Sequence, residues 1–543
     1  MDTDEVVAQG RLALKEGRWA DARDAFEAAL AVEERPDAVQ GLGDALWWLG
    51  DAGGYLKTME RAYTMFRESG ETLEALVMCL WLSGVQLKSM GNRAACRGWI
   101  ATAERLAKQS DIQEMSGWLL WARASATTDP ATAMDCSQRS LQIAGQAGDR
   151  DLELCAMSEL GKALVGLGRV AEGMELIDEA MAGAIGGESQ SLDTVVATCC
   201  SMMGACDQAA DLDRVAEWCR AADRFMQTYG SPFLYADCRL RYGCVLLATG
   251  HWANAERELL AAAAATTRDT DYYQLATARL AELRLRQGRQ EEAEKLLAQI
   301  ADSPAGQAPL ARLHHLRGQN ETATRLLGRL LGGGEIENVE RASALDLLVD
   351  CRLAEKDIET AAGALDELTS LAHPGAERVQ AHRAFAEARI VLAMEAGAEE
   401  GLERAMRLFS NCKLPYETAR VRLVLASALS GKPEVAMAEA QGAFSTFERL
   451  GAVTDADGAA RLIRSLGGAA RTGPKDAGVL TKREQEVLRL LGAGLSNPQI
   501  AERLFLSRKT VSHHVSNVLS KLGFRNRSEA AVQAERILSS PIL

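Results

Sequence analysis

Small residues and single aromatic residues recur at regular distances over the first 450 residues, and this pattern limits the possible folds more than any other feature of the chain. The first unit holds Gly10, Gly17, Trp19, Ala22, Phe26 and Ala29, and Gly43 and Gly50 follow 33 residues later. The series continues through Gly84, Gly91 and Cys96; Gly161, Gly168 and Ala180; Gly243, Gly250, Trp252, Ala255 and Ala262; Gly288 and Ala293; and Gly318 and Ala323. Such a period indicates stacked supersecondary units that cannot bury their apolar faces alone.

The spacing resembles the tetratricopeptide unit, in which small residues let two antiparallel helices approach closely and an aromatic ring fills the gap beside the next pair. Two gaps between successive turn glycines, of 77 and 82 residues, each fit two units, one of them poorly marked. Degenerate units with Ala361 and Leu365, and with Gly431 and Ala436, extend the array, and a helix over 459–466 closes it. The predicted fold is all-α, a tetratricopeptide-like α-solenoid followed by a small four-helix helix-turn-helix domain.

The stretch from 479 to 538 has a different organisation. Thr481 and Glu484 form a capping box before an amphipathic helix, and Ser496-Asn-Pro-Gln499 repeats the device before a short helix at 499–504. After a tight turn, Ser507 is the expected N-cap of a third helix that runs to about Leu522. Two helices separated by so short a turn predict a helix-turn-helix.

The third of these helices has two distinct faces. Val511, Val515, Val518 and Leu522 recur at helical spacing and should face the core. The opposite face carries, on two adjacent rows, Arg508, Ser512 and Ser516, and Lys509 and His513. A polar face of this kind is what a recognition helix needs in order to enter a major groove.

The motifs Leu480-Thr-x-Arg-Glu-x-Glu-Val-Leu, Gly-Leu-Ser-Asn-x-x-Ile-Ala, Ser-x-Lys-Thr-Val-x-x-His-Val-x-Asn-x-x-x-Lys-Leu-Gly and Asn-Arg-x-Glu-Ala closely resemble the C-terminal domain of LuxR-type transcription regulators over about 60 residues. The resemblance implies that base edges are met by Ser512, His513 and Ser516. It implies phosphate or positioning contacts by Ser496, Arg508, Lys509, Thr510, Asn517 and Lys521. His513 and Ser516 are not the Arg or Lys often found at reading positions, so no operator sequence follows.

The charge distribution supports a local nucleic-acid interface. Residues from Lys475 onward hold 11 Lys and Arg against 6 Asp and Glu, a formal charge of +5, so the first 474 residues must carry −19 to give the total of −14. An acidic body disfavours DNA contact elsewhere. One alternative to a DNA-binding surface is a basic face that is merely solvated. Another is a metal site at His513 and His514, but adjacent residues on a helix point in different directions and no Cys lies in this domain.

The repeats and the helix-turn-helix motifs divide the chain into three predicted segments. Residues 1–466 form the repeat array, 467–478 a flexible linker rich in Gly and Ala, and 479–543 the DNA-binding domain. A fourth helix beginning near Asn526 presents a thin apolar face with Ala530 and Ala534, which suits packing against a second copy in a homodimer on DNA.

The concave surface of the array is expected to bind an effector, a small molecule or a protein, although it could instead only space and dimerise the DNA-binding domains. All nine Trp lie in the first 252 residues, and some of them could line an apolar ligand pocket. Six of twelve Cys lie between 199 and 244 and could serve a redox or metal role, but ordinary core packing explains both groups as well.

Several classes are disfavoured. Gly161-Lys162 and Gly431-Lys432 lack the rest of a phosphate-binding loop, and hydrolase motifs are absent, so we expect neither an enzyme nor a bound cofactor or metal. No signal peptide or membrane span is expected, and the Cys pattern is typical of reduced cytoplasmic thiols. The main hypothesis is a cytoplasmic DNA-binding transcription regulator controlled through its array. The second hypothesis is a protein-interaction scaffold, in which DNA binding only localises the protein. The third hypothesis is an ATP-dependent switch.

Overall fold

The computed structural model describes residues 2–468 and 482–534, apart from 231, 334–335, 374–375, 430, 505, 523–526, 528–529 and 532–533. For residues 221–227, 482, 509, 513, 517 and 520–522 only the backbone is described. The chain divides into two compact units, Met1–Gly468 and Ala469–Leu543, called the array and the head below. The predicted linker falls, from residue 469 onward, outside the described residues.

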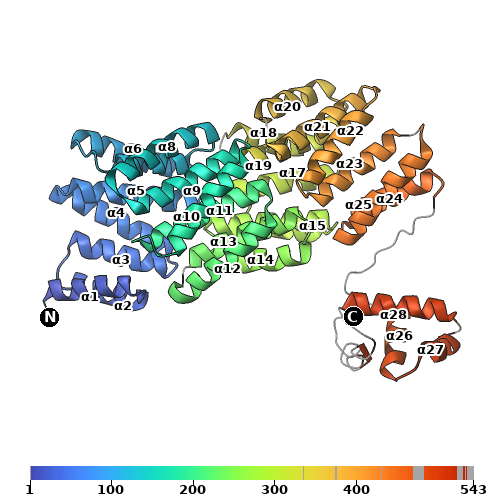
Figure 1. Cartoon of the computed structure of the whole chain (residues 1–543), viewed down its shortest axis with the longest axis horizontal. Helices are drawn as coiled ribbons and strands as arrows, with labels where there is room; N and C mark the ends of the chain where they lie inside the picture. Colours follow the sequence, from blue (N-terminus) through green and yellow to red (C-terminus); the bar gives the residue numbers. More distant parts are fainter. Residues whose placement is uncertain are drawn as a thin grey trace. The chain divides into compact units, whose positions relative to one another are not determined.

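Every regular element in the described part of the chain is a helix (Figure 1). The first half of the array holds α1 (Thr3–Lys15), α2 (Trp19–Leu30), α3 (Pro36–Trp48), α4 (Ala52–Ser69), α5 (Thr72–Lys88), α6 (Arg93–Gln109), α7 (Ser116–Ala126), α8 (Pro130–Ala147), α9 (Arg150–Gly166), α10 (Val170–Ile185), α11 (Leu192–Ala209) and α12 (Leu212–Tyr229). The second half holds α13 (Pro232–Ala248), α14 (Trp252–Ala264), α15 (Asp271–Arg286), α16 (Gln290–Ala298), the short helix η1 (Pro304–Gly306), α17 (Gln307–Leu316), α18 (Asn320–Gly332), α19 (Asn338–Ala354), α20 (Ile358–Leu371), α21 (Glu377–Ala393), α22 (Glu399–Asn411), α23 (Pro415–Ala428), α24 (Pro433–Leu450) and α25 (Val453–Ser465).

The helices of the array stack as antiparallel pairs. Each helix of the array packs against the next one in the chain, and most odd-numbered helices also pack against the following odd-numbered helix, as α9 does with α11 and α11 with α13. The odd-numbered helices therefore form one layer and the even-numbered helices a second. This is the arrangement of an α-solenoid, and it confirms the predicted all-α repeat fold.

The small residues and the aromatic ring of the repeat act as the sequence predicts. Phe26 is fully buried, and a Cβ atom on Gly10 would lie 2.8 Å from its ring, so the glycine lets α1 lie directly against the ring. Trp19 is also buried in this first pair. The two poorly marked units are the pairs α7–α8 and α11–α12, which confirms the interpretation of the two long gaps.

Two details of the array differ from the expectation. The closing helix α25 begins at Val453 rather than at 459, two residues after Gly451, which caps α24 in the left-handed region at φ +81°. The pair α21–α22 has no marker in the predicted series. Its turn holds Glu395 with φ +57°, as that of α19–α20 holds Lys356 with φ +61°, at the place where many other pairs have glycine.

The array coils back on itself. The guanidinium of Arg378 on α21 donates to the carbonyl oxygen of Asp207 on α11 at 2.5 Å, across 171 residues. The backbone N–H of Asp271 donates to the Ser89 carbonyl at 2.7 Å. Further along the chain, the ring centroids of Trp252 and Tyr416 lie 5.8 Å apart. Successive turns of the superhelix therefore touch, and residues far apart in the sequence share an interior.

The head contains α26 (Lys482–Gly492), α27 (Asn497–Leu504) and α28 (Arg508–Leu522). Its core is formed by two clusters of buried side chains: Val487, Leu491, Ile500, Ala501, Val511 and Val515 in the first, and Leu488, Val518, Ala530 and Ala534 in the second. The predicted fourth helix falls largely outside the described residues, although Arg527, Ala530, Ala531 and Ala534 have helical backbone.

Candidate nucleic-acid interface

Side-chain caps fix the start of both helices of the predicted helix-turn-helix. At the start of α27 the backbone N–H and the hydroxyl of Ser496 both donate to the Gln499 side-chain oxygen, at 2.8 and 2.7 Å. At the start of α28 the Ser507 hydroxyl accepts from the backbone N–H of Thr510 at 3.1 Å. These caps confirm the two expected helix starts, although α27 begins at Asn497, two residues before the predicted position.

The two faces of α28 separate as the spacing predicts. Val511, Val515 and Val518 are buried against the other helices of the head, whereas Arg508, Ser512 and Ser516 are exposed. Because these three exposed residues follow one another at intervals of four, they form a single row along the helix. α28 thus presents a polar surface opposite its apolar one.

The remaining predicted site residues fall into two groups. Ser496 is exposed, and Thr510 is half-buried with its hydroxyl 2.7 Å from that of Ser507. The side chains of the other four lie outside the described residues: Lys509, His513, Asn517 and Lys521. Their backbone belongs to α28, so their positions on the helix follow from its register alone.

A polar network joins the exposed row to the rest of the head. The Asn497 side-chain amide donates to the Ser512 hydroxyl at 3.1 Å, and its oxygen accepts from the Arg527 guanidinium at 2.7 Å. Arg527 also donates to the backbone carbonyl of Leu495. Sequence reasoning assigned no role to Asn497 or Arg527, although both stand in the motifs quoted above. Ser512 is therefore anchored at its predicted reading position by a contact within the head.

The small residues expected at a dimer seam are used inside the head. Ala530 and Ala534 are buried beside Leu488 and Val518, with Ala534 only 2% exposed. A Cβ atom on Gly492 would lie 2.7 Å from that of Ala534. These two alanines cannot also form a surface for a second copy, which corrects the sequence-based interpretation of this face.

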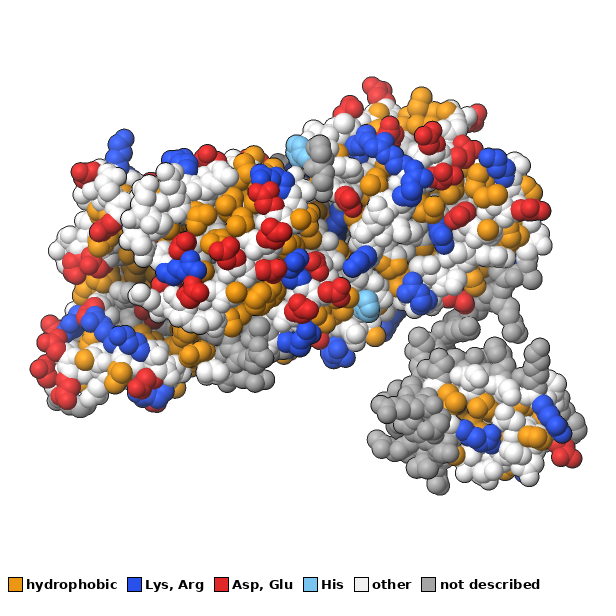
Figure 2. All heavy atoms as spheres, viewed as in Figure 1, with side chains coloured by type: hydrophobic (Ala, Val, Ile, Leu, Met, Phe, Trp, Pro, Cys, Tyr) orange, Lys and Arg blue, Asp and Glu red, His pale blue; other side chains and the backbone are white. Residues whose placement is uncertain are grey.

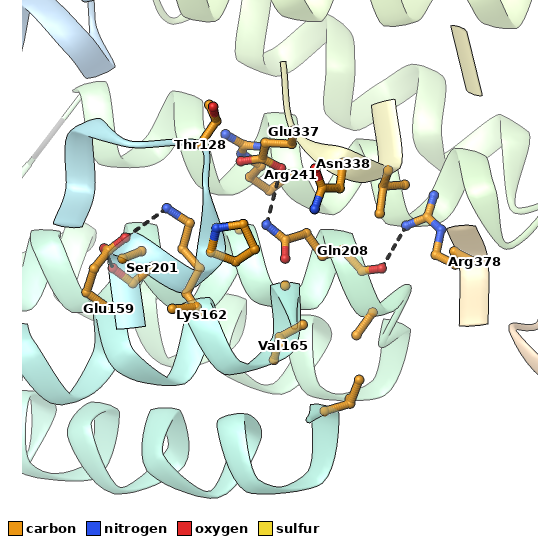
Figure 3. A pocket seen from close by; sticks show the side chains of 18 of the residues that line it. Thr128, Glu159, Lys162, Val165, Ser201, Gln208, Arg241, Glu337, Asn338 and Arg378 are labelled. Atoms are coloured by element: carbon orange, nitrogen blue, oxygen red, sulfur yellow. Dashed lines mark hydrogen bonds and ion pairs between the residues drawn. The ribbon is translucent and has the colours of Figure 1, made fainter. Parts of the chain in front are cut away.

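The array contains a cavity of about 770 Å³ (Figure 3). Its walls come mainly from the odd-numbered helices α5, α9, α11, α13 and α15, together with the starts of α8, α10, α19 and α21. Charged and amide side chains such as Glu159, Lys162, Gln208, Arg241 and Glu337 line it, and no Trp contributes.

The tryptophans serve instead in packing. Trp19 stacks on Trp48 with ring centroids 4.7 Å apart, and Trp47 stacks on Phe233 at 4.5 Å. The indole of Trp252 is buried and donates to the Leu247 carbonyl at 3.1 Å. The hypothesis of a Trp-lined apolar pocket therefore finds no counterpart in this cavity.

Most of the cysteines are core residues as well, whereas Cys200 and Cys412 are half-buried and line the cavity. Cys199, Cys206, Cys219 and Cys238 are buried with Met202 and Met203 in one cluster. Burial raises the pKa of the Cys199 and Cys206 thiols far above the usual range, which keeps them protonated and poorly nucleophilic. Among the described residues, no group of His, Cys, Asp and Glu side chains is arranged to hold a metal ion. In the same part of the chain, no helix combines the length and apolar character that crossing a membrane requires.

The fold and this interface define a helical-repeat protein with a helix-turn-helix head. The sequence model of the family described as bacterial regulatory proteins, luxR family, matches residues 478–534. The spore germination protein GerE of Bacillus subtilis is 48% identical over 59 residues, which are 11% of this chain and 80% of that protein. The chain belongs to the LuxR family of bacterial regulatory proteins.

Two longer relatives extend the comparison. The DNA-binding transcriptional activator DevR/DosR of Mycobacterium tuberculosis is 46% identical over 82 residues, 15% of this chain and 37% of that protein. The putative HTH-type transcriptional regulator Rv0890c of the same species is 32% identical over 166 residues, 30% of this chain and 19% of that protein. The chain thus spans only a minor part of either relative. The second match is longer than the head, so it must include repeat residues.

Among solved structures, the APC/C hetero-tetramer Cut9-Hcn1 aligns over 86% of this chain and 96% of that chain, with a TM-score of 0.36 and 12% identity. A similarity this low does not define an arrangement of repeats, which follows from the helix packing of the array itself.

Proposed function

We propose that this protein is a sequence-specific DNA-binding transcription regulator whose repeat array controls its head. The observation that carries the proposal is the exposed row Arg508, Ser512 and Ser516 on α28, opposite a buried valine row. A helix with this division of faces, capped at its start and preceded by a short helix, has the form of a recognition helix.

We assign the contacts as the motifs imply. Ser512, His513 and Ser516 read base edges in the major groove, and Ser496, Arg508, Lys509, Thr510, Asn517 and Lys521 contact phosphates or set the register. Asn497 and Arg527 hold Ser512 and the start of α27 in place. Sequence preference then comes from few direct contacts, each worth about 1–3 kcal/mol of discrimination.

In this proposal each of the two units has its own function. Residues 479–543 bind DNA as a homodimer on two half-sites, while residues 1–466 bind an effector or partner and 467–478 tether the two. Acting on bacterial DNA, the protein works in the cytoplasm. The dimer contact uses a surface other than the buried Ala530 and Ala534.

The first experiment is selection of bound duplexes from a random library, followed by anisotropy titrations over a range of salt concentrations. Lys509→Ala and Lys521→Ala should weaken binding to every duplex and each reduce the salt slope by about 1, because each removes one phosphate contact. Lys432→Ala, an exposed change in the array, is the matched control. Unchanged slopes in both head variants would contradict the phosphate assignment.

The second experiment tests base reading. His513→Ala and Ser516→Ala should change the preferred base at one or two operator positions and leave affinity for unrelated DNA unchanged, because they do not contact the backbone. If selection returns the same motif for both variants, α28 reads DNA through other residues. Failure of the whole chain to prefer any duplex would favour the scaffold hypothesis.

A further inference from the structure

The charges that line the array cavity are only partly paired with one another. On one side, the Lys162 ammonium lies 3.1 Å from a Glu159 carboxylate oxygen, and the Ser201 hydroxyl donates to that carboxylate at 2.9 Å. Figure 3 shows this pair on one side of Gln208 and Arg378 on the other, so charged groups extend across the whole cavity. Arg241 reaches Asp207 and Asp237 only at 3.4 and 3.5 Å.

The remaining cations lie beyond direct ion-pair distance of the carboxylates in the cavity, although Lys88 acts on the Glu159 carboxylate and Arg93 acts on that of Asp271. Among the described residues, neither Lys88 nor Arg93 forms an ion pair. Arg378 donates to the backbone carbonyls of Asp207 and Gln208, and its Nε is buried without a partner. Each of the three side chains is half-buried and lines the cavity. They supply positive charge that no direct ion pair neutralises among the described residues, although the Glu159 and Asp271 carboxylates balance part of it from a distance.

Carboxylates are left over in the same cavity. Glu337 is contacted by the Gln208 amide at 3.3 Å and, within the described part of the chain, forms no direct ion pair, although its charge acts on Arg241 and Lys162 from a greater distance. Asp271 likewise has no ion-pair partner there, and its burial raises the pKa of its carboxyl from 3.8 to about 6. The side-chain oxygens of Ser125 and Gln208 are buried in the wall without a hydrogen bond. Buried polar atoms normally have partners, so the wall offers sites for a polar ligand.

This lining argues against several ligand classes. Tyr272 is the one aromatic residue in the described wall, which gives a nucleobase little to stack on. Carboxylates on several walls would repel a polyphosphate, and an apolar molecule would leave charges of both signs desolvated. A volume of about 770 Å³ lies inside the range of about 300–1,000 Å³ usual for ligand sites.

We propose that the cavity binds a zwitterion, a short peptide with free ends, whose carboxylate meets Lys88, Arg93 or Arg378 and whose ammonium meets Asp271 or Glu337. Peptide N–H and C=O groups pair with the amides of Gln208 and Asn338 and with the hydroxyl of Ser125. Opposite charges inside a partly enclosed cavity attract a ligand more strongly than the same charges do in water. The proposal gives the effector of the proposed regulator a chemical class and rests on that function.

The test is thermal stabilisation of the full chain by defined mixtures, measured without DNA. The probe is a mixture of tripeptides and tetrapeptides built from uncharged residues with free ends. The comparison arms are the same mixture with N-acetyl and C-amide ends, a mixture of free amino acids, and AMP. We expect a rise in the unfolding midpoint with the free-ended peptides alone. An equal rise with the capped peptides, a response only to amino acids or AMP, or no response in any arm would overturn the proposal.

Two substitutions that nearly keep the size and shape of the side chain test whether the peptide binds in the cavity. Glu337→Gln keeps an oxygen that can accept from Gln208, and Lys88→Met keeps the alkyl stem, so both variants should fold. Each should weaken binding of the most stabilising peptide at least tenfold by calorimetry. Glu400→Gln and Lys108→Met, at exposed positions on α22 and α6, are matched controls that should bind as the parent does. Unchanged affinity in both cavity variants would place the peptide elsewhere and overturn the assignment.

The outcomes separate this proposal from the proposed function. If the protein selects an operator but no peptide stabilises it, only the assignment of a peptide to the cavity is wrong. If it binds peptides through Lys88 and Glu337 but selects no duplex, the cavity site stands and the proposed role as a regulator is wrong.

Discussion

The indole Nε1 of Trp19 donates a hydrogen bond to the backbone carbonyl of Tyr229, 210 residues further along the chain. One residue belongs to the first helix pair and the other ends α12. Gly17 lies in the same contact, since a Cβ atom there would be 3.2 Å from the Tyr229 ring. The first pair is therefore held by the next turn of the superhelix as well as by its neighbour in the chain.

Trp19→Phe should lower the unfolding midpoint and increase amide exchange in α1 and α2. The change removes the hydrogen bond and leaves the Tyr229 carbonyl without its donor, at a cost of about 1–3 kcal/mol. Trp81→Phe is the control, because Trp81 is 39% exposed. Equal exchange in the two variants would mean that the contact with Tyr229 does not hold the first pair.

Gly10→Ala should destabilise the array, whereas Gly84→Ala should not. A Cβ atom at Gly10 would lie 2.8 Å from the Phe26 ring, and overpacking of this kind costs about 1–3 kcal/mol. Gly84 has nothing within 4 Å of the added atom and lies inside α5. Alanine should therefore stabilise that helix by up to about 1 kcal/mol. Thermal unfolding of the two variants is the measurement, and a loss of the same size in both would contradict the packing argument.

Asp44→Asn should stabilise the array at pH 8 and have little effect near pH 4. Burial, together with the nearby carboxylate of Asp193 and no balancing cation, raises the pKa of Asp44 from 3.8 to about 7. The folded state then binds more protons than the unfolded state between about pH 4 and 7, so stability falls as the pH rises through that window. Above it the penalty is constant, and removing it is worth on the order of 1–3 kcal/mol.

Unfolding midpoints measured at several pH values test this prediction. Asp302→Asn, at an exposed position, should leave the profile of the parent unchanged. A uniform shift of the Asp44→Asn midpoint at all pH values would indicate a packing effect rather than a proton-linked one.

Ala534→Glu should unfold the head rather than only separate two copies of it. The side chain is 2% exposed and lies against Leu488 and Val518, so a carboxylate there would be buried without a partner. Ala531→Glu, at a half-buried neighbouring position, should be milder. Circular dichroism of the isolated residues 475–543 distinguishes the two. A folded Ala534→Glu head that has lost cooperative DNA binding would restore the dimer interpretation.

The parts of the fold that sequence predicts well are those with local markers. The turn glycines identify helix pairs because close packing needs small residues, and Phe26 marks the first pair because its ring fills the gap there. The caps at Ser496 and Ser507 fix the starts of two helices of the head. Where Glu395 takes the place of a turn glycine, the pair α21–α22 goes unmarked.

Contacts across the superhelix have no such local marker. Nothing near Trp47 in the sequence reveals that it stacks on Phe233, and nothing near Arg378 reveals that it reaches Asp207. The Trp-rich first half therefore suggested a ligand pocket that the packing does not provide. The cavity instead gathers Lys88, Gln208 and Glu337 from separate helices, which only the tertiary structure brings together.

Binding of peptide and operator should be linked. If a peptide in the cavity tightens operator binding tenfold, the operator must tighten peptide binding by the same factor, about 1.4 kcal/mol, because the coupling free energy is a property of the pair. We expect calorimetric peptide affinity to rise when the selected operator is added and to stay unchanged with a scrambled duplex. Glu337→Gln should weaken peptide binding both with and without operator and leave operator affinity in the absence of peptide unchanged, since Glu337 belongs to the array. Identical peptide affinities with and without operator, in a chain that binds both, would show that the cavity does not control the head.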